Sequence, residues 1–244
     1  MKDKEKDKLL SKIEQLSLAF QPMVEVTTSG HTIKAYEILL RYRDGVFFPF
    51  QIFEELIASE ESCNLLNQWY EQQISDCLET YPDTCFSLNI DFQQLLYPST
   101  WDLLKSVSQY KQHLGIELTE FYQVTNSEHR ALFLKAMNYI QDLGMKIAFD
   151  DVGNGQHSIV FVTENIQFVK SCKLSLLHFK HLEAETTALI IELWVKIAKE
   201  FNVHLVIEGV EDEAAAKMLC DKGVKYQQGF YWAEPISKKK ILTA

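Results

Sequence analysis

The sequence predicts an α/β protein that folds as a modified (β/α)8 barrel of the TIM type, with one antiparallel strand contributed by an N-terminal hairpin. Three observations support this fold class. The 244 residues, of which 47% are hydrophobic, suffice for one barrel-sized core. Eight apolar runs suit strands, and from the second onward helical stretches separate them. The first two runs are joined only by the turn "TTSGH", so the strands they form must be antiparallel.

The chain divides into a charged N-terminal helix at 1–17 and a barrel domain at 18–244, because no linker rich in glycine, proline or serine interrupts the rest. The expected strands are "LAFQPMVEV", "TIKAYEILLRY", "CFSLNID", "LGIELTE", "MKIAFDD", "IQFVKSC", "VHLVIEGV" and "VKYQQGF". The expected helical stretches lie near 5–17, 50–60, 62–80, 99–110, 127–142, 157–163, 183–201 and 212–221. Apolar strands that alternate with helices are typical of a parallel sheet covered by those helices.

Composition narrows the classes of function. A formal net charge of -10 argues against a DNA-binding or RNA-binding surface and against an anionic membrane surface. The five cysteines follow no CxxC spacing, so neither a disulfide framework nor a zinc site is indicated. The opening "MKDKEKDKLL" is too charged for a signal peptide, and no apolar run reaches about 18 residues, the length of a membrane span. We therefore expect a cytoplasmic protein without a membrane contact.

Polar residues lie at or near the ends of successive apolar runs, and one lies inside a run. Because the carboxyl ends of barrel strands form one rim, these side chains are expected to lie close together, where barrel enzymes carry their chemistry. Glu37 is the residue inside a run, and a charge there must be paired or bound to a metal if it points inward. The full set comprises Glu37, Asn89, Glu117, Asp150, Asp151, Lys170, Glu208 and Gln228.

So many carboxylates on one rim repel one another unless cations lie between them. An all-oxygen set suits Mg2+ or Mn2+, and two such ions about 4 Å apart are a usual device for phosphodiester cleavage. Each residue alone has a structural alternative: Glu117 can be an ordinary strand end, and Lys170 can extend its amine to solvent. These alternatives would have to hold independently at every strand end, so the pattern as a whole favours a metal site.

On the basis of these residues, the chain resembles the EAL-domain family of cyclic di-GMP phosphodiesterases, from about Leu18 to Pro235. "FQPMVEV" is similar to the opening segment of the family, and "EILLR" to its naming motif, with isoleucine in place of alanine. "SLNID", "ELTE", "DDVGNG", "IEGVE" and "QGFYWAEP" match the later motifs in order. The resemblance implies a barrel with one reversed strand and hydrolysis of cyclic di-GMP to linear pGpG.

The resemblance also implies roles for individual residues. The implied metal ligands, for two Mg2+ or Mn2+ ions, are Glu37, Asn89, Glu117, Asp150, Asp151 and Glu208. Lys170 matches the lysine that holds the attacking water, and Gln228 matches a glutamine at the metal site. The catalytic residues that the resemblance implies are Lys170, Glu37, Glu208 and Gln228. The remaining roles are substrate contact by Arg41 and Gln21, and anchoring of the loop after Asp151 by Glu120 and Asn154. Ca2+ is expected to inhibit by binding without supporting turnover, because its larger shell positions water badly. A homodimer fits the family, and no protein partner is indicated.

Departures from the family pattern support a second hypothesis. Val152 and Asn154 replace the usual residues of the loop after the two aspartates, and Ser171 and Cys172 follow Lys170 where isoleucine and aspartate are usual. These changes favour a catalytically silent domain that acts as a cyclic di-GMP receptor or a protein-interaction module. A hydrolase of another phosphodiester is a third alternative.

Overall fold

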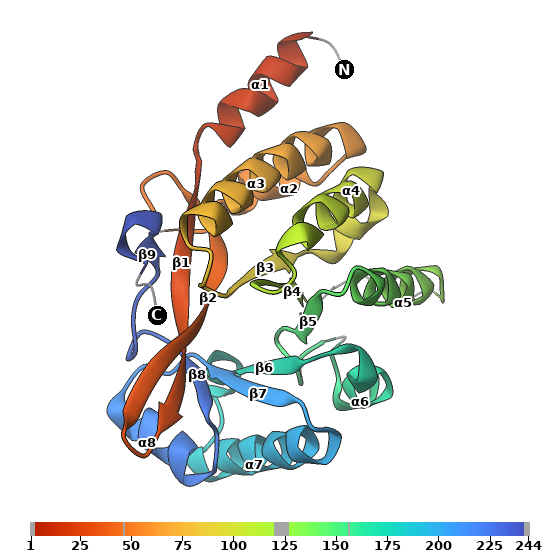
Figure 1. Cartoon of the computed structure of the whole chain (residues 1–244). Coiled ribbons are helices and arrows are strands. Elements are labelled where there is room, and N and C mark those ends of the chain that lie inside the picture. Colours follow the sequence, from red (N-terminus) through yellow and green to blue (C-terminus); the bar gives the residue numbers. More distant parts are fainter. Residues whose placement is uncertain (1–2, 46, 120–126, 156, 242–244) are drawn as a thin grey trace.

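The computed structural model describes residues 3–45, 47–119, 127–155 and 157–241. Eight strands close into a ring, and a short ninth strand, β9 (Ile236–Ser237), pairs with β1 outside that ring (Figure 1). The ring consists of β1 (Leu16–Thr27), β2 (Gly30–Tyr42), β3 (Phe86–Ile90), β4 (Leu114–Leu118), β5 (Lys146–Phe149), β6 (Ser171–Ser175), β7 (His204–Glu208) and β8 (Tyr226–Gln228).

One strand of the ring is reversed. β1 is antiparallel to both of its ring neighbours, β2 and β8, whereas β2 to β8 are parallel to one another in sequence order. The cause is the short connection after Thr27, which can only return the chain beside itself. The mixed α/β barrel predicted from the sequence is confirmed.

The helices lie outside the ring; α1 precedes β1, and from β2 onward helices alternate with the strands in sequence (Figure 1). Among the described helices, none combines the length and apolar character needed to cross a membrane. The helices are α1 (Asp3–Ile13), α2 (Phe50–Leu56), α3 (Glu60–Thr80), α4 (Pro98–Val107), α5 (Ser127–Asp142), α6 (Ile159–Asn165), α7 (Ala184–Phe201) and α8 (Glu213–Asp221). Short 3-10 turns are η1 (Phe92–Leu96), η2 (Ser108–Tyr110), η3 (Ile166–Phe168), η4 (Leu176–Phe179) and η5 (Lys238–Lys240).

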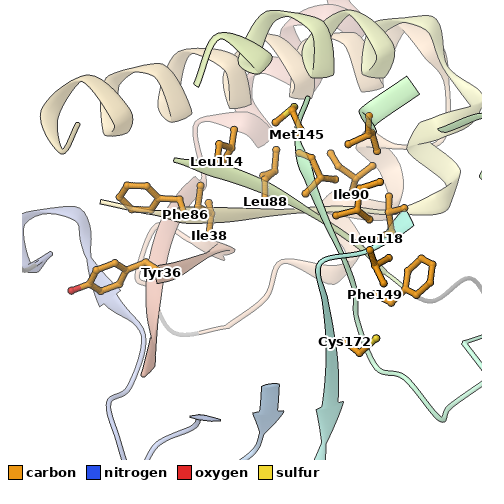
Figure 2. Packing of buried hydrophobic residues seen from close by; sticks show 14 of the residues in the cluster. Tyr36, Ile38, Phe86, Leu88, Ile90, Leu114, Leu118, Met145, Phe149 and Cys172 are labelled. Carbon is orange, nitrogen blue, oxygen red and sulfur yellow. The ribbon is translucent and has the colours of Figure 1, made fainter. Parts of the chain in front are cut away.

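The main core lies between the ring and the helices. Alternate residues of a strand point to opposite faces, so the large apolar side chains of each strand share the outward face. Figure 2 shows Leu88, Leu114 and Phe149 in this layer, packed beside Met145 and, further along, Cys172. The residues between them in sequence face the barrel interior, which is where the polar residues of the strands gather.

The sixth strand does not lie where the sequence predicted it. The apolar run at 166–172 begins with the 3-10 turn η3, and β6 starts only at Ser171. Within β6 the outward positions are Cys172 and Leu174, both part of the hydrophobic core, and the inward positions are polar. The strand therefore carries fewer apolar residues than its neighbours β5 and β7, and the more apolar turn before it was predicted as the strand instead.

Candidate metal centre

The inward polar side chains converge at the carboxyl ends of the strands. Each comes from a different strand or from the residue just after it, because the parallel strands bring their carboxyl ends to one rim. They are Glu37 from β2, Asn89 from β3, Glu117 from β4, Asp150 after β5, Lys173 from β6, Glu208 from β7 and Gln228 from β8.

Lys173 is the cation at the middle of this group. Its Nζ lies 2.8 Å from Glu37 Oε2 and 2.5 Å from Glu117 Oε2. Glu208 Oε1 is 2.8 Å away and Asp150 Oδ1 3.7 Å away. The side chain of Lys173 is only 3% exposed, so water screens these interactions little. Burial lowers the pKa of Lys173, yet the four surrounding carboxylates raise it well above the usual value, and the amine is charged.

Glu37 is held by hydrogen bonds as well as by charge. Its Oε2 accepts from Lys173 and from Gln228 Nε2 at 2.7 Å, and its Oε1 accepts from Asn89 Nδ2 at 2.7 Å. Burial raises the pKa of Glu37, but the charge of Lys173 and these hydrogen bonds outweigh burial and hold the pKa below its ordinary value. This carboxylate is therefore ionised and fixed in orientation.

The other carboxylates of the group are harder to ionise. Burial is the first cause and repulsion among them adds to it, against the charge of Lys173. The pKa of Glu117 rises to about 8 and that of Asp150 to about 6, and the pKa of Glu208 lies well above its usual value. One ammonium group does not neutralise four carboxylates. Additional positive charge at the cluster would therefore be stabilising.

The donor set fits a hard divalent cation. Carboxylate oxygens of Asp150, Asp151 and Glu208 lie within 4.8 Å of one another. Asn89 Oδ1 and Asp150 Oδ1 are buried and accept no hydrogen bond within the described structure. Buried oxygens without a donor are costly unless a cation contacts them. An all-oxygen set with two such atoms suits Mg2+ or Mn2+.

Asp151 has a backbone conformation that is unusual for a side chain other than glycine, with φ at 49°. Two contacts support it: His178 Nε2 lies 2.8 Å from Asp151 Oδ1, and the backbone N–H of Asn154 donates to the carbonyl of Asp151 at 3.2 Å. The side chain of Asn154 accepts from the N–H of Gly155 at 3.0 Å. Glu120, the predicted second anchor of this loop, lies outside the described residues.

Lys170 is not part of the cluster, and its predicted position is corrected. It is exposed, precedes β6, and lines a cavity at the amino-terminal mouth of the barrel. Lys170 lies three positions before Lys173, which in extended chain corresponds to about 10 Å. If Lys173 is taken as the site lysine, Leu174 and Ser175 follow it at the positions where the resemblance led us to expect isoleucine and aspartate. Cys172 faces outward and has no bearing on the site.

Arg41 and Gln21, which the sequence predicted as substrate contacts, line hollows beside the cluster. Two hollows open at the carboxyl rim; Arg41 and Glu37 line one of them with Gln21, and Arg41 lines the other with Asn89. Arg41 is half-buried, which lowers its pKa, while the charge of Glu37 offsets part of this effect. Gln21 lies opposite Glu37 in the β1–β2 pairing. Both residues are thus placed to contact a ligand bound over the carboxylates.

Sequence reasoning missed four features of the site. These are Lys173, the neighbouring Ser175, His178, and the aromatic residues Phe48, Phe50 and Phe230 around the two hollows. The alternation of "SCKLS" could have identified Lys173 and Ser175 as inward residues, since Cys172 and Leu174 are the apolar members. His178, which contacts Asp151, follows in η4 and carried no sequence signal.

The chain is thus a closed α/β barrel with one antiparallel strand. Its carboxyl rim carries acidic residues, an asparagine and a buried lysine, and this arrangement is suited to binding metal ions. Within that class, the family model of the EAL domain matches residues 6–235, and the chain belongs to this family.

Individual relatives are more distant. The chain is 26% identical over 238 residues to the "Probable cyclic di-GMP phosphodiesterase PdeN" of Escherichia coli, an alignment that covers 92% of this chain and 44% of that protein. The chain thus spans less than half the length of this relative. Among solved structures, the EAL enzyme Bd1971 bound to cAMP and cyclic di-GMP has a TM-score of 0.76 at 20% identity, over 97% of this chain and 67% of that one. A manganese and cyclic di-GMP complex of Klebsiella pneumoniae BlrP1 has a TM-score of 0.74 at 21% identity, over 91% of this chain and 56% of that one.

Proposed function

We propose that the protein is a metal-dependent phosphodiesterase that hydrolyses cyclic di-GMP to linear pGpG. The observation that supports this most strongly is the convergence of four carboxylates on Lys173 at the carboxyl rim, next to buried oxygens that lack a hydrogen-bond donor. The EAL family membership and the relatives named for cyclic di-GMP support the choice of substrate.

The proposed ligands of two divalent ions, Mg2+ or Mn2+, are Glu37, Asn89, Glu117, Asp150, Asp151 and Glu208. Bound there, such ions would polarise the phosphodiester and favour ionisation of the attacking water. Gln228 keeps the carboxylate of Glu37 in place through its 2.7 Å hydrogen bond.

Lys173 takes the role that motif matching gave to Lys170. Its ammonium group is buried among the carboxylates, so it can donate a hydrogen bond to an attacking water and stabilise that water as hydroxide. Arg41 and Gln21, in the adjoining hollow, are proposed to contact the ligand, with Arg41 on a phosphate. Asn154 and Glu120 are proposed to keep the loop after Asp151 ordered.

The alternative is a receptor that binds cyclic di-GMP without cleaving it. Ser175 favours this alternative, because it lies in register with Glu208 on the neighbouring strand and lines the same hollow. A carboxylate at this place would add a ligand or a base, which a hydroxyl cannot replace at neutral pH.

Incubation of the purified protein with cyclic di-GMP and separation of the nucleotides tests the proposal. We expect pGpG to form with Mg2+ or Mn2+, and expect Ca2+ to compete for the site while supporting little turnover. Glu37→Gln is the matched variant, because it removes the charge at nearly constant size. If wild-type protein bound cyclic di-GMP and left it intact in Mn2+, the receptor would replace the enzyme.

A further inference from the structure

A second cavity opens at the opposite, amino-terminal mouth of the barrel. The barrel interior is normally filled by layers of large side chains. Here the inward positions below the metal centre carry small residues, and they leave a cavity of about 310 Å3. The small residues lining it are Ala35, Ser87, Gly115, Ala148 and Ser171.

The mouth of this cavity carries positive charge, although the whole chain has a net charge of -10. Lys34, Lys146 and Lys170 line it together with His204. Lys34 pairs with Glu25 at 2.7 Å. Within the ranges that the structure covers, Lys146 and Lys170 form no ion pair.

Two further observations point to a ligand with an acidic group. Burial lowers the pKa of His204, and the charges of Lys170, Lys146 and Lys225 add to this effect, whereas the carboxylate of Glu25 opposes it. Positive charge therefore predominates around His204. In addition, His113 lines the cavity, and its Nδ1 is buried without a hydrogen-bond partner in the described structure.

The walls between the mouth and the floor are largely apolar, with Met23, Ala148 and Val206 among them. We propose that this cavity binds a small organic anion, with an apolar or aromatic body between the strands and its acidic group at Lys146 and Lys170. An exposed pair of lysines alone would attract any anion weakly, whereas the apolar walls select one that also has a body to bury.

This site lies on the amino-terminal side of the carboxylate cluster, whereas the proposed substrate site lies on the carboxyl-terminal side. Glu37, Glu117 and Lys173 form part of the cavity lining, so a ligand that fills the cavity contacts the underside of the carboxylate cluster. Binding itself does not depend on the proposed hydrolysis of cyclic di-GMP, and it can be measured without that substrate.

The fluorescent anion 1-anilinonaphthalene-8-sulfonate is a suitable probe, because it joins a sulfonate to aromatic rings. Titration of the folded wild-type protein is expected to give saturable emission with one site per chain. The variant Lys146→Glu/Lys170→Glu should bind the probe at least tenfold more weakly. The control Lys6→Glu/Lys8→Glu makes the same charge change on α1, at exposed positions away from the cavity, and should bind as wild type does.

A second variant tests the cavity without changing charge. Gly115 has an ordinary backbone conformation, and a Cβ there would meet its nearest neighbour, the carbonyl oxygen of Lys146, at 3.7 Å. A side chain therefore fits, and Gly115→Leu should fill the cavity and weaken binding in the same way. If both the charge variant and Gly115→Leu bound the probe as tightly as wild type, the probe would lie elsewhere and the proposal would be overturned.

Discussion

At the residue scale, Lys173 is the main source of positive charge within the carboxylate cluster. Its ammonium group is buried and lies within 4 Å of four carboxylates. Removal of one partner from a buried charge network typically costs about 3–5 kcal/mol, because the remaining charges lose their compensation. The same residue is therefore expected to affect both stability and chemistry.

Lys173→Ala should lower turnover of cyclic di-GMP by roughly 100-fold or more, since it removes the group that we propose stabilises the attacking water. Lys170→Ala, three residues earlier and outside the cluster, should retain turnover within about twofold. Initial rates at saturating Mn2+ compare the two. Loss of turnover in Lys170→Ala with full activity in Lys173→Ala would return the role to Lys170.

His178 is the second residue whose role can be isolated. It contacts Asp151 at 2.8 Å, and residues that orient a metal ligand typically contribute about 10–100-fold to metal affinity. We expect His178→Ala to weaken Mn2+ binding within that range, measured by calorimetry or by the electron paramagnetic resonance signal of free Mn2+. His181→Ala, at an exposed position in the following turn, is the control. Equal Mn2+ affinity in both variants would mean that Asp151 needs no support from His178.

At the scale of elements, alternation within the strands separates two functions. Outward residues build the core under the helices, and inward residues build the site and the cavity below it. The sequence predicted seven of the eight ring strands near their observed positions, because apolar residues and their spacing between helical stretches mark them. β6 was misplaced because its inward residues are Ser171, Lys173 and Ser175, which interrupt the run. A strand with a buried lysine gives a weak hydrophobic signal, and that lysine is the one that the four carboxylates surround.

The loop after β8 has a strict requirement for glycine. Gly229 has φ at 154°, and a Cβ there would lie 2.2 Å from the carbonyl oxygen and 2.4 Å from the nitrogen of Val210. Gly229→Ala must therefore separate this loop from Val210 and disturb the adjacent Gln228. Strain of this kind costs about 1–3 kcal/mol, so we expect a lower Tm and reduced turnover.

Gly30→Ala is the matched control for that prediction. Gly30 has φ at 139°, but no atom lies within 4 Å of the position of a Cβ. The substitution brings backbone strain without a clash, so it should lower the Tm less than Gly229→Ala and leave turnover unchanged. Equal losses of stability in the two variants would show that the clash is relieved without cost.

At the scale of the whole molecule, the reversed strand β1 closes the ring, and the parallel arrangement of β2 to β8 places their polar carboxyl ends on one rim. The fold class and most of the acidic residues could be predicted, because strand-end positions can be inferred from hydrophobic runs. The cavity at the amino-terminal mouth could not, since small inward residues such as Gly115 and Ala148 give no signal until the register is known. The partner of Asn154 at Glu120 lies outside the described residues and stays a prediction.

Mutual repulsion among the carboxylates predicts that divalent ions stabilise the fold as a whole. A ligand at 100 times its Kd adds about 2.7 kcal/mol of stability, which corresponds to a rise of several degrees in Tm for a chain of this size. We expect Mn2+ to raise the Tm of the wild-type protein by this order, and expect a chelator to reverse the rise. Asn89→Leu, which removes a buried oxygen, should reduce the shift; an undiminished shift would place the ion away from Asn89.

The most direct measurement of the central claim is hydrolysis in water enriched in oxygen-18, with the protein in molar excess over cyclic di-GMP. If the carboxylate cluster and Lys173 direct a water molecule to phosphorus, pGpG forms only when Mg2+ or Mn2+ is present, and its terminal phosphate carries one labelled oxygen. Glu37→Gln should form none in the same time. Cyclic di-GMP that is bound by the wild-type protein, yet recovered intact and unlabelled in the presence of Mn2+, would contradict the account.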